Sequence, residues 1–265
     1  MLMDRLISTL RPIRFRGKGR LLGRLVPRSG ERTATLFGSR IDLDLGDLVQ
    51  REMYLGVFEP KETRLALGWL RTGMTFVDVG ANVGYYTLLA ARRVGHQGRV
   101  LAIEPGPYAY RRLQHTVNHN RLTQVRTLQV ALGDEPGNQP LYVPPEDSGN
   151  YSPTMLPNDS GTPVNTTVRT LDDCLEVWGA KEVGLLKLDV EGFEPAVLRG
   201  ARRALADGRI RAVLCEFNDF WLGEAGTDPA KLYQTLTAAG FADQSAPPWF
   251  RPGCIETRFF VRRDG

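Results

Sequence analysis

The sequence predicts a doubly wound α/β domain built on a parallel sheet. From residue 75 onward, short apolar runs alternate with segments of helical periodicity. The runs are rich in branched apolar residues with little polar alternation, which is typical of strands buried on both faces of a sheet. Alternation of such strands with helices favours parallel pairing, with helices covering both faces.

Each expected element has its own local signal. The expected strands are the apolar runs at residues 75–80, 99–105, 125–132, 183–190, 211–217 and 257–263. The expected helices are the periodic segments at residues 59–70, 82–94, 107–120 and 229–240, and one more from Pro195 to about residue 206. Pro60 and Pro195 suit the first turn of a helix, which needs no backbone N–H. Gly240 suits a helix C-terminal cap.

The 265 residues are expected to form one large domain with an appendage. Residues 1–45 read as a basic N-terminal extension that ends in a small hairpin, and residues 46–265 as the main domain. An insertion at about residues 133–163 is rich in Pro, Gly, Ser, Asn and Asp and is expected to be irregular. Long irregular insertions are usually functional, so Tyr142 and Tyr151 are candidates to line a pocket.

Net positive charge is confined to the N-terminal tail. Residues 1–28 hold eight of the 34 basic residues and one of the 30 acidic ones, which leaves the rest of the chain with a net charge of −3. Such a body is poorly suited to phosphate backbones, so no nucleic-acid partner is expected. Apolar residues recur at helical spacing in this tail, at Leu2, Leu6, Leu10 and Ile13. We expect a terminal helix packed on the body or a partner, with peripheral membrane contact as the alternative.

The sequence also suggests a compartment. It contains no run of 18 apolar residues, which argues against a membrane span. The N-terminus lacks the apolar stretch and cleavage site of a signal peptide. Cys174, Cys215 and Cys254 form no CxxC motif, which favours a reducing compartment. We therefore expect a cytoplasmic protein.

Acidic residues lie where four of the expected strands end. They are Asp78, Glu104, Asp189 and Glu216, each placed at or next to the carboxyl end of an apolar run. In an open α/β sheet, ligands bind outside the carboxyl ends of the strands. The sequence therefore predicts a ligand site at this edge, lined by carboxylates.

The first strand-to-helix turn, DVGANVG, contains Asp78, Gly80, Asn82 and Gly84. Glycine allows close approach of a ligand, and the following helix N-terminus favours an anion. The GxxxG spacing differs from the GxGxxG of dinucleotide sites, and Asp78 suits an ammonium group better than a pyrophosphate. Glu104 lies 20 residues past Gly84, where an acid binds a ribose diol. A ligand with ribose, carboxylate and amine groups fits S-adenosylmethionine better than NAD.

Four blocks, FVDVGANVGYYT, AIEP, VNTTVRTLDD and LLKLDVEGFEPAVLRGA, occur in order between about residues 50 and 220. Together they resemble the FkbM family of S-adenosylmethionine-dependent methyltransferases. The resemblance implies a class I methyltransferase sheet, which is Rossmann-like, doubly wound and mostly parallel with a reversed C-terminal strand. It also implies methylation of a hydroxyl on a sugar, glycolipid or polyketide-type natural product.

The resemblance also assigns donor-binding residues by position. Asp78, Gly80, Asn82 and Gly84 resemble the donor-binding loop, and Glu104 resembles the ribose acid. Glu59 resembles a recurrent acid of the family, and Ala131 is expected to border the adenine. Residues 1–45 lie outside the resemblance and receive no function from it.

The candidate catalytic residues are Asp189, Glu191 and Glu216. Methyl transfer to an alcohol needs a base that removes the hydroxyl proton as the bond forms. Mutual repulsion between Asp189 and Glu191 would raise one pKa, which favours such a base. We expect Asp189 or Glu191 to act as base or acceptor anchor and Glu216 to orient the acceptor. Glu194 precedes Pro195 and is explained by helix-start chemistry.

A divalent cation bound by Asp189, Glu191 and Glu216 is the alternative use of these acids. No spacing in the sequence is diagnostic of a metal site, so we predict none. His115 and His119 lie four apart but lack the HExxH acid, which favours a solvated helix face.

Two other functions fit the fold. A nicotinamide-dependent oxidoreductase would need a GxGxxG turn, which the sequence lacks. A catalytically silent donor-binding module would keep the donor residues and dispense with the acid group. Binding of S-adenosylmethionine and of NAD separates the first alternative from a methyltransferase, and turnover separates the second.

Overall fold

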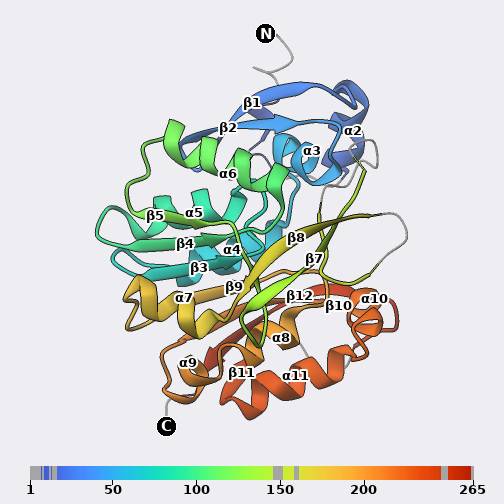
Figure 1. Ribbon diagram of the computed structural model, residues 1–265. Helices are drawn as coiled ribbons and strands as arrows, with labels where there is room; N and C mark the ends of the chain where they lie inside the picture. The colour runs from blue at the N-terminus through green and yellow to red at the C-terminus, as the bar shows by residue number, and fades with distance from the viewer. Residues whose placement is uncertain are drawn as a thin grey trace.

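The computed structural model describes residues 7, 9–11, 13, 17–145, 152–157, 161–245 and 250–263. Its centre is a seven-stranded sheet of order β11-β12-β10-β9-β3-β4-β5 (Figure 1). The strands are β3 (Thr75–Val79), β4 (Arg99–Ile103), β5 (Val125–Leu128), β9 (Leu185–Leu188), β10 (Ala212–Asn218), β11 (Phe241–Asp243) and β12 (Ile255–Arg262).

The central sheet is parallel except at one end. Strands β5, β4, β3, β9 and β10 pair in parallel, whereas β12 runs antiparallel to both β10 and β11. The predicted mostly parallel sheet with a reversed C-terminal strand is therefore confirmed. Because β3, β4, β9 and β10 run the same way, their carboxyl ends share one edge.

Helices cover both faces of this sheet (Figure 1). They are α4 (Pro60–Trp69), α5 (Tyr85–Val94), α6 (Pro107–His119), α7 (Leu171–Trp178), α8 (Glu194–Arg199), α9 (Arg202–Ala206), α10 (Asp219–Glu224) and α11 (Pro229–Ala238). Successive strand residues pack on opposite sides: Phe76 lies in a core with α4 and α5, and Val77 in a core with α7, α8 and α11. The expected helix from Pro195 to residue 206 is two helices that break at Gly200. A Cβ there would lie 2.0 Å from the carbonyl oxygen of Gly133.

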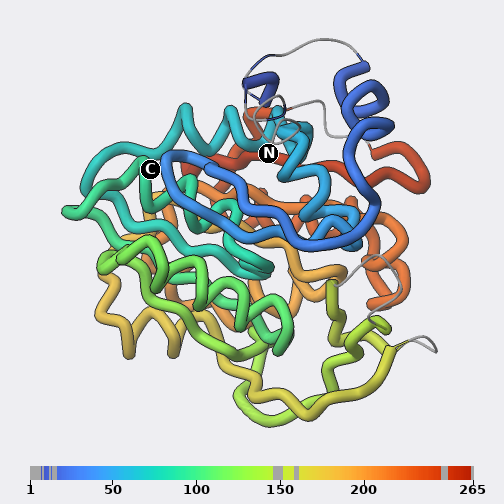
Figure 2. The backbone as a smooth tube through the Cα atoms, turned by 90° about the horizontal axis from the view of Figure 1, so that it is seen from above, coloured from blue at the N-terminus to red at the C-terminus, as the bar shows by residue number. Residues whose placement is uncertain are grey.

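The N-terminal elements are α2 (Lys18–Leu25), the antiparallel strands β1 (Glu31–Leu36) and β2 (Ser39–Asp44), and α3 (Leu48–Leu55). Seen from above, they lie over one side of the main domain (Figure 2). They share an apolar core that includes Leu22, Leu43 and Met53 and that reaches Leu88 of α5. Strands β1 and β2 form a hairpin over residues 31–44, within the expected N-terminal extension of residues 1–45. Much of the predicted terminal helix, including Leu2 and Leu6, falls outside the described residues.

The insertion is more regular than its composition suggests. Strands β6 (Ala131–Leu132), β7 (Gly137–Val143) and β8 (Thr162–Arg169) form a second, three-stranded sheet. The strand expected over residues 125–132 is thus two strands, β5 and β6, in different sheets. Tyr142 and Thr154 exchange backbone hydrogen bonds of 2.8 and 3.1 Å, which holds Thr154 against β7. Tyr151 lies outside the described residues. Among the residues described, no helix has the length and apolar character needed to span a bilayer.

Candidate active site

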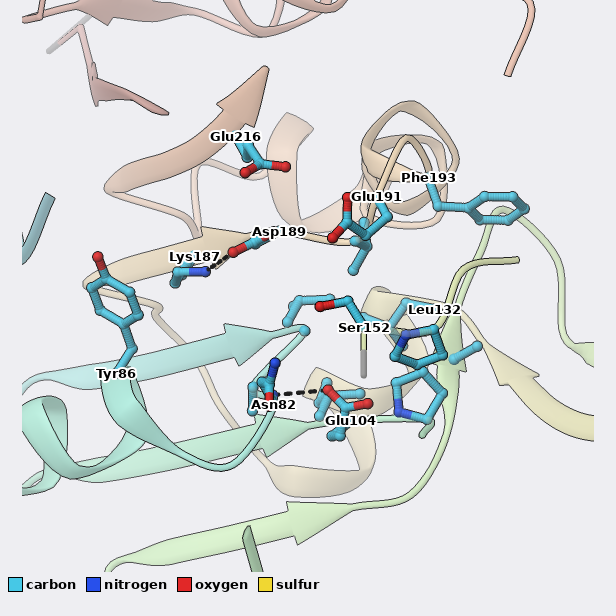
Figure 3. Close-up of a pocket in the computed structure, with 18 of the residues that line it drawn as sticks. Asn82, Tyr86, Glu104, Leu132, Ser152, Lys187, Asp189, Glu191, Phe193 and Glu216 are labelled. Atoms are coloured by element: carbon cyan, nitrogen blue, oxygen red, sulfur yellow. Dashed lines mark hydrogen bonds and ion pairs between the residues drawn. The ribbon is translucent and has the colours of Figure 1, made fainter. Parts of the chain in front are cut away.

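A pocket opens at the carboxyl ends of the central strands, with an empty volume of about 1000 Å³ including its mouth. Eight predicted site residues line it: Glu59, Gly80, Asn82, Glu104, Ala131, Asp189, Glu191 and Glu216. Asn82 and Glu104 lie on one side, opposite Asp189 and Glu191 from the segment between β9 and α8 and Glu216 from β10 (Figure 3). The predicted residues Asp78 and Gly84 are not part of its wall.

The β3–α5 turn is fitted between two neighbouring strand ends. The backbone N–H groups of Gly80 and Ala81 both donate to the carbonyl of Ile103 at 3.0 Å. Gly80 has φ +79°, and a Cβ there would lie 1.8 Å from the carbonyl oxygen of Asp189. Only glycine allows this approach, so the turn requires the residue that the motif supplies. Gly84 lies at the start of α5 and packs against Leu113 of α6.

Glu104 is held as a double acceptor. Its Oε2 accepts from the N–H of Asn82 and its Oε1 from the N–H of Gly106, both at 2.8 Å. The residue is 3% exposed, and burial raises its pKa to about 7 against the opposing effect of these two hydrogen bonds. Each carboxylate oxygen keeps a lone pair for a further donor. The side chain is therefore suited to two adjacent hydroxyls, as on a ribose.

Asp78 lies behind the pocket wall. Its Oδ2 accepts from the hydroxyl of Thr87 at 2.7 Å, and its Oδ1 is buried without a hydrogen-bond partner among the described residues. Burial raises its pKa, while Lys187, its direct neighbour across β3 and β9, acts to lower it. The structure thus places Asp78 against Lys187 rather than on the surface that a ligand amine would touch.

Lys187 is the site residue that the sequence analysis missed. Its Nζ donates to Asp189 Oδ2 at 2.7 Å and lies 4.8 Å from the ring centroid of Tyr86. Burial would lower the pKa of Lys187, but Asp189, Glu59 and Asp78 outweigh burial and raise it. Lysine is rarely buried without a partner, so its position within the apolar run LLKLDV was a usable signal.

Carboxyls outnumber cations in this pocket. Among the described lining residues, Lys187 is the only basic side chain. Burial, followed by repulsion from Asp189, raises the pKa of Glu191 to about 8 and that of Glu216 well above its ordinary value. Burial also raises the pKa of Glu59 to about 7, and this side chain accepts from the hydroxyl of Tyr86. The pocket therefore favours a cationic ligand, which would offset the crowded carboxylates.

Glu194 lies at the start of a helix, as expected, but its side chain hydrogen-bonds to a residue that precedes that helix. It begins α8, is buried, and its Oε1 accepts from the N–H of Val190 at 2.9 Å. Within the described residues, no three His, Cys, Asp or Glu side chains are arranged to hold a metal ion. His115 is exposed and lies 3.3 Å from Asp42 on the molecular surface, as predicted.

Replacing Lys187 by methionine is expected to destabilise the fold by about 3 kcal/mol at pH 8, because buried carboxyls lose their counter-ion. Without the lysine, the folded-state pKa of Asp78 and Glu59 rises further above the unfolded value. The variant therefore keeps its stability at low pH, where these carboxyls are protonated, and loses it as the pH rises toward the raised pKa. The loss of unfolding free energy relative to the parent should be smaller at pH 5.5 than at pH 8. Urea unfolding at both pH values measures it.

The exposed Lys181→Met change is the control and should alter the free energy of unfolding by less than about 0.5 kcal/mol. An equal deficit for Lys187→Met at both pH values would show that lost packing, not lost charge, causes the effect.

A mostly parallel, doubly wound sheet with a reversed C-terminal strand and a pocket at its carboxyl edge defines the class I methyltransferase fold. The sequence signature of the methyltransferase FkbM domain matches residues 78–242, which is more than half of the chain. The protein therefore belongs to the FkbM methyltransferase domain family, as its motifs predicted.

Three relatives are similar to this chain. "Methyltransferase 1" of Beauveria bassiana is 35% identical over 144 residues, covering 47% of this chain and 57% of the relative. "31-O-demethyl-FK506 methyltransferase FkbM" of Streptomyces tacrolimicus is 31% identical over 180 residues, covering 57% and 67%. "Hexuronic acid methyltransferase AglP" of Haloferax volcanii is 27% identical over 169 residues, covering 61% of each. The match thus spans less than two thirds of the Beauveria and Haloferax relatives.

Proposed function

We propose that this protein transfers a methyl group from S-adenosylmethionine to a hydroxyl oxygen of a sugar, glycolipid or polyketide-type natural product. The observation that carries the proposal is that acidic side chains lie on two opposite sides of one pocket. Glu104 presents a backbone-anchored carboxylate on one side, and Asp189, Glu191 and Glu216 gather on the other (Figure 3). The names of two relatives add support, since one specifies 31-O-demethyl-FK506 and the other hexuronic acid.

The pocket residues fit the methyl donor. Bound S-adenosylmethionine supplies a methyl group on a cationic sulfur that is open to displacement. Glu104 would accept hydrogen bonds from the ribose hydroxyls, while the turn containing Gly80 and Asn82 lines the wall beside it. Ala131 and Leu132 offer an apolar surface to the adenine. The excess of carboxyls over Lys187 suits the positive charge of the donor.

The acids take different roles in the proposed reaction. Asp189 is fixed by Lys187 through Oδ2, so it serves as an anchor whose Oδ1 accepts from the acceptor molecule. Glu191 has a pKa raised to about 8, which places it where a general base is effective near neutral pH. Glu216 Oε2 is buried and has no hydrogen-bond partner in the described part of the chain. That oxygen is suited to orient a second hydroxyl of the acceptor.

Methyl transfer is tested by incubating the protein with methyl-labelled S-adenosylmethionine and a panel of uronic acids, other sugars and hydroxylated polyketides. We expect labelled product with at least one of these and stoichiometric S-adenosylhomocysteine. Tight donor binding without transfer to any panel member would favour the silent binding module. Calorimetric binding of NAD in place of S-adenosylmethionine would favour the oxidoreductase.

Donor affinity is expected to rise roughly tenfold between pH 6 and pH 8.5, because a bound cation favours ionised carboxyls. The pKa values of Glu59 and Glu191 are raised to about 7 and about 8 in the free protein, so these groups are protonated at pH 6 and ionise across this range. S-adenosylhomocysteine lacks the sulfonium charge and should show a weaker dependence. Titration calorimetry of both compounds gives the comparison; equal pH dependence would contradict a role for the sulfonium charge.

The proposed compartment is the cytoplasm. Cys174, Cys215 and Cys254 are all free, which supports a reducing environment.

A further inference from the structure

The exposed surface of α2 combines leucine with arginine. Leu21 is 54% exposed and Leu25 is 46% exposed, whereas Leu22 is buried against the body. Arg20 and Arg24 are also exposed, and they precede the two leucines by one position each. Residues four apart share one side of a helix, so the leucines and the arginines form two adjacent stripes that face away from the protein.

This helix is firmly attached to the protein. Arg51 of α3 donates to the carbonyls of Gly23 at 2.6 Å and Val26 at 3.2 Å. Lys18, at the other end of α2, donates to the carbonyl of Gly56 at 3.1 Å. The exposed leucines are therefore carried by a fixed element, and their exposure does not arise from a detached end of the chain.

Apolar exposure is concentrated in this region. Among the described residues, half of the large exposed apolar side chains lie between residues 13 and 48: Ile13, Leu21, Leu25 and Leu48. Leu48 is 58% exposed and begins α3, one turn before the arginine that binds the C-terminal part of α2. Figures 1 and 2 both show α2 beside α3. Exposed apolar side chains on two helices in contact are typical of an interaction surface.

The charge of this region indicates which kind of partner binds the exposed surface of α2. Helix α2 contains no acidic residue, and Arg28 follows shortly after its end. The remainder of the chain beyond residue 28 carries a net charge of −3, so the basic surface is local. A nucleic acid would match the arginines but leave the leucines in water. An anionic bilayer matches both, since its headgroups pair with arginine and its acyl region accepts leucine.

We propose that α2 and the start of α3, a surface centred on Arg20, Leu21, Arg24, Leu25 and Leu48, bind the face of an anionic membrane. The helix lies in the plane of the interface, with its leucines inserted and its arginines among the headgroups. The same α3 contributes Val49 and Met53 to the pocket wall. Docking would therefore hold the pocket close to the lipid surface. This inference does not depend on the reaction proposed above.

Sedimentation with vesicles tests the proposal. The full chain is mixed with two kinds of vesicle, one of phosphatidylcholine alone and one that also contains roughly 30–40% phosphatidylglycerol. Each mixture is prepared at low and at high salt. We expect binding to the anionic vesicles at low salt, weakening at high salt as charges are screened. Arg20→Glu/Arg24→Glu should reduce the partition coefficient by more than roughly 30-fold, the value expected from the loss of two positive charges alone. Leu21→Ser/Leu25→Ser should reduce it roughly tenfold.

Control variants change exposed residues on other helices. Val177→Ser on α7 removes an apolar side chain that is 65% exposed, and Arg92→Glu/Arg202→Glu reverses two exposed charges on α5 and α9. These variants should bind vesicles as the parent does, and circular dichroism should show all of them folded. Absence of binding to anionic vesicles, or equal loss in the controls, would overturn the proposal. So would a change in oligomeric state, without a change in vesicle binding, on replacing the leucines, because that result would assign the surface to a second copy of the chain.

Discussion

Glu104→Gln is expected to weaken the binding of S-adenosylmethionine by at least about 100-fold, because charge-assisted hydrogen bonds to a buried group are lost. The carboxylate uses one oxygen for the N–H of Asn82 and the other for that of Gly106. Glutamine has a single acceptor oxygen, so its amide NH₂ must face one of these N–H groups. The ribose also loses one of its two acceptors. Titration calorimetry at pH 8 measures the change.

The exposed Glu224→Gln change is the matched control and should leave the dissociation constant within twofold or so. Thermal unfolding of both variants separates a loss of binding from a loss of fold. If folded Glu104→Gln binds the donor within a few-fold of the parent, the donor does not use this carboxylate and the orientation of the ligand proposed here is wrong.

The edge of the sheet that carries the site was predictable from the sequence, because acids follow the buried runs directly. Glu104, Asp189 and Glu216 end their runs and all three line the pocket. Four strand ends with one direction must meet at one edge, whatever the details of packing. The sequence motif also supplied Gly80, whose lack of a Cβ is required by the carbonyl of Asp189.

Asp78 lies behind the pocket wall for a reason that strand geometry explains. Successive residues of a strand point to opposite faces, so Asp78 shares a face with Phe76, which packs against α4 and α5. Lys187 shares that face for the same reason, two residues after Leu185, and is the partner of Asp78 across the two strands. Strand geometry defines which residues of one run share a face. Which residues of two runs lie opposite each other depends on the register of the pairing, which only the folded sheet defines.

The second sheet could not be read from the insertion. Strand β7 is exposed along most of its length, so it lacks the apolar alternation that marks a half-buried strand. Strand β7 is held in place by backbone hydrogen bonds to β8, the next strand along the chain. Strand β8 is rich in threonine rather than in aliphatic residues. The result matters for the site, because Leu141 of β7 and Met155 of the following loop line the pocket.

Glu191→Gln is expected to lower kcat by about 100- to 1,000-fold while leaving donor affinity within a few-fold, because a general base contributes to the chemical step. In the parent, with S-adenosylmethionine held at saturation, kcat/KM for the acceptor should rise with pH through the pKa of Glu191, near 8, since the base acts only when ionised. The variant should lose this ascending limb. Initial rates from pH 6 to pH 9, with an acceptor found in the labelled-methyl screen, measure both effects.

Asp189→Asn is the informative comparison, because Asp189 is placed as an anchor fixed by Lys187 at 2.7 Å. Its replacement should raise the KM for the acceptor more than it lowers kcat. The ascending limb should remain but move to lower pH, because the repulsion from Asp189 that helps to raise the pKa of Glu191 is lost. The exposed Glu176→Gln change controls for charge alone and should alter neither constant. If Asp189→Asn removes the limb and Glu191→Gln keeps it, the two roles are exchanged, and the carboxyl paired with Lys187 is the base.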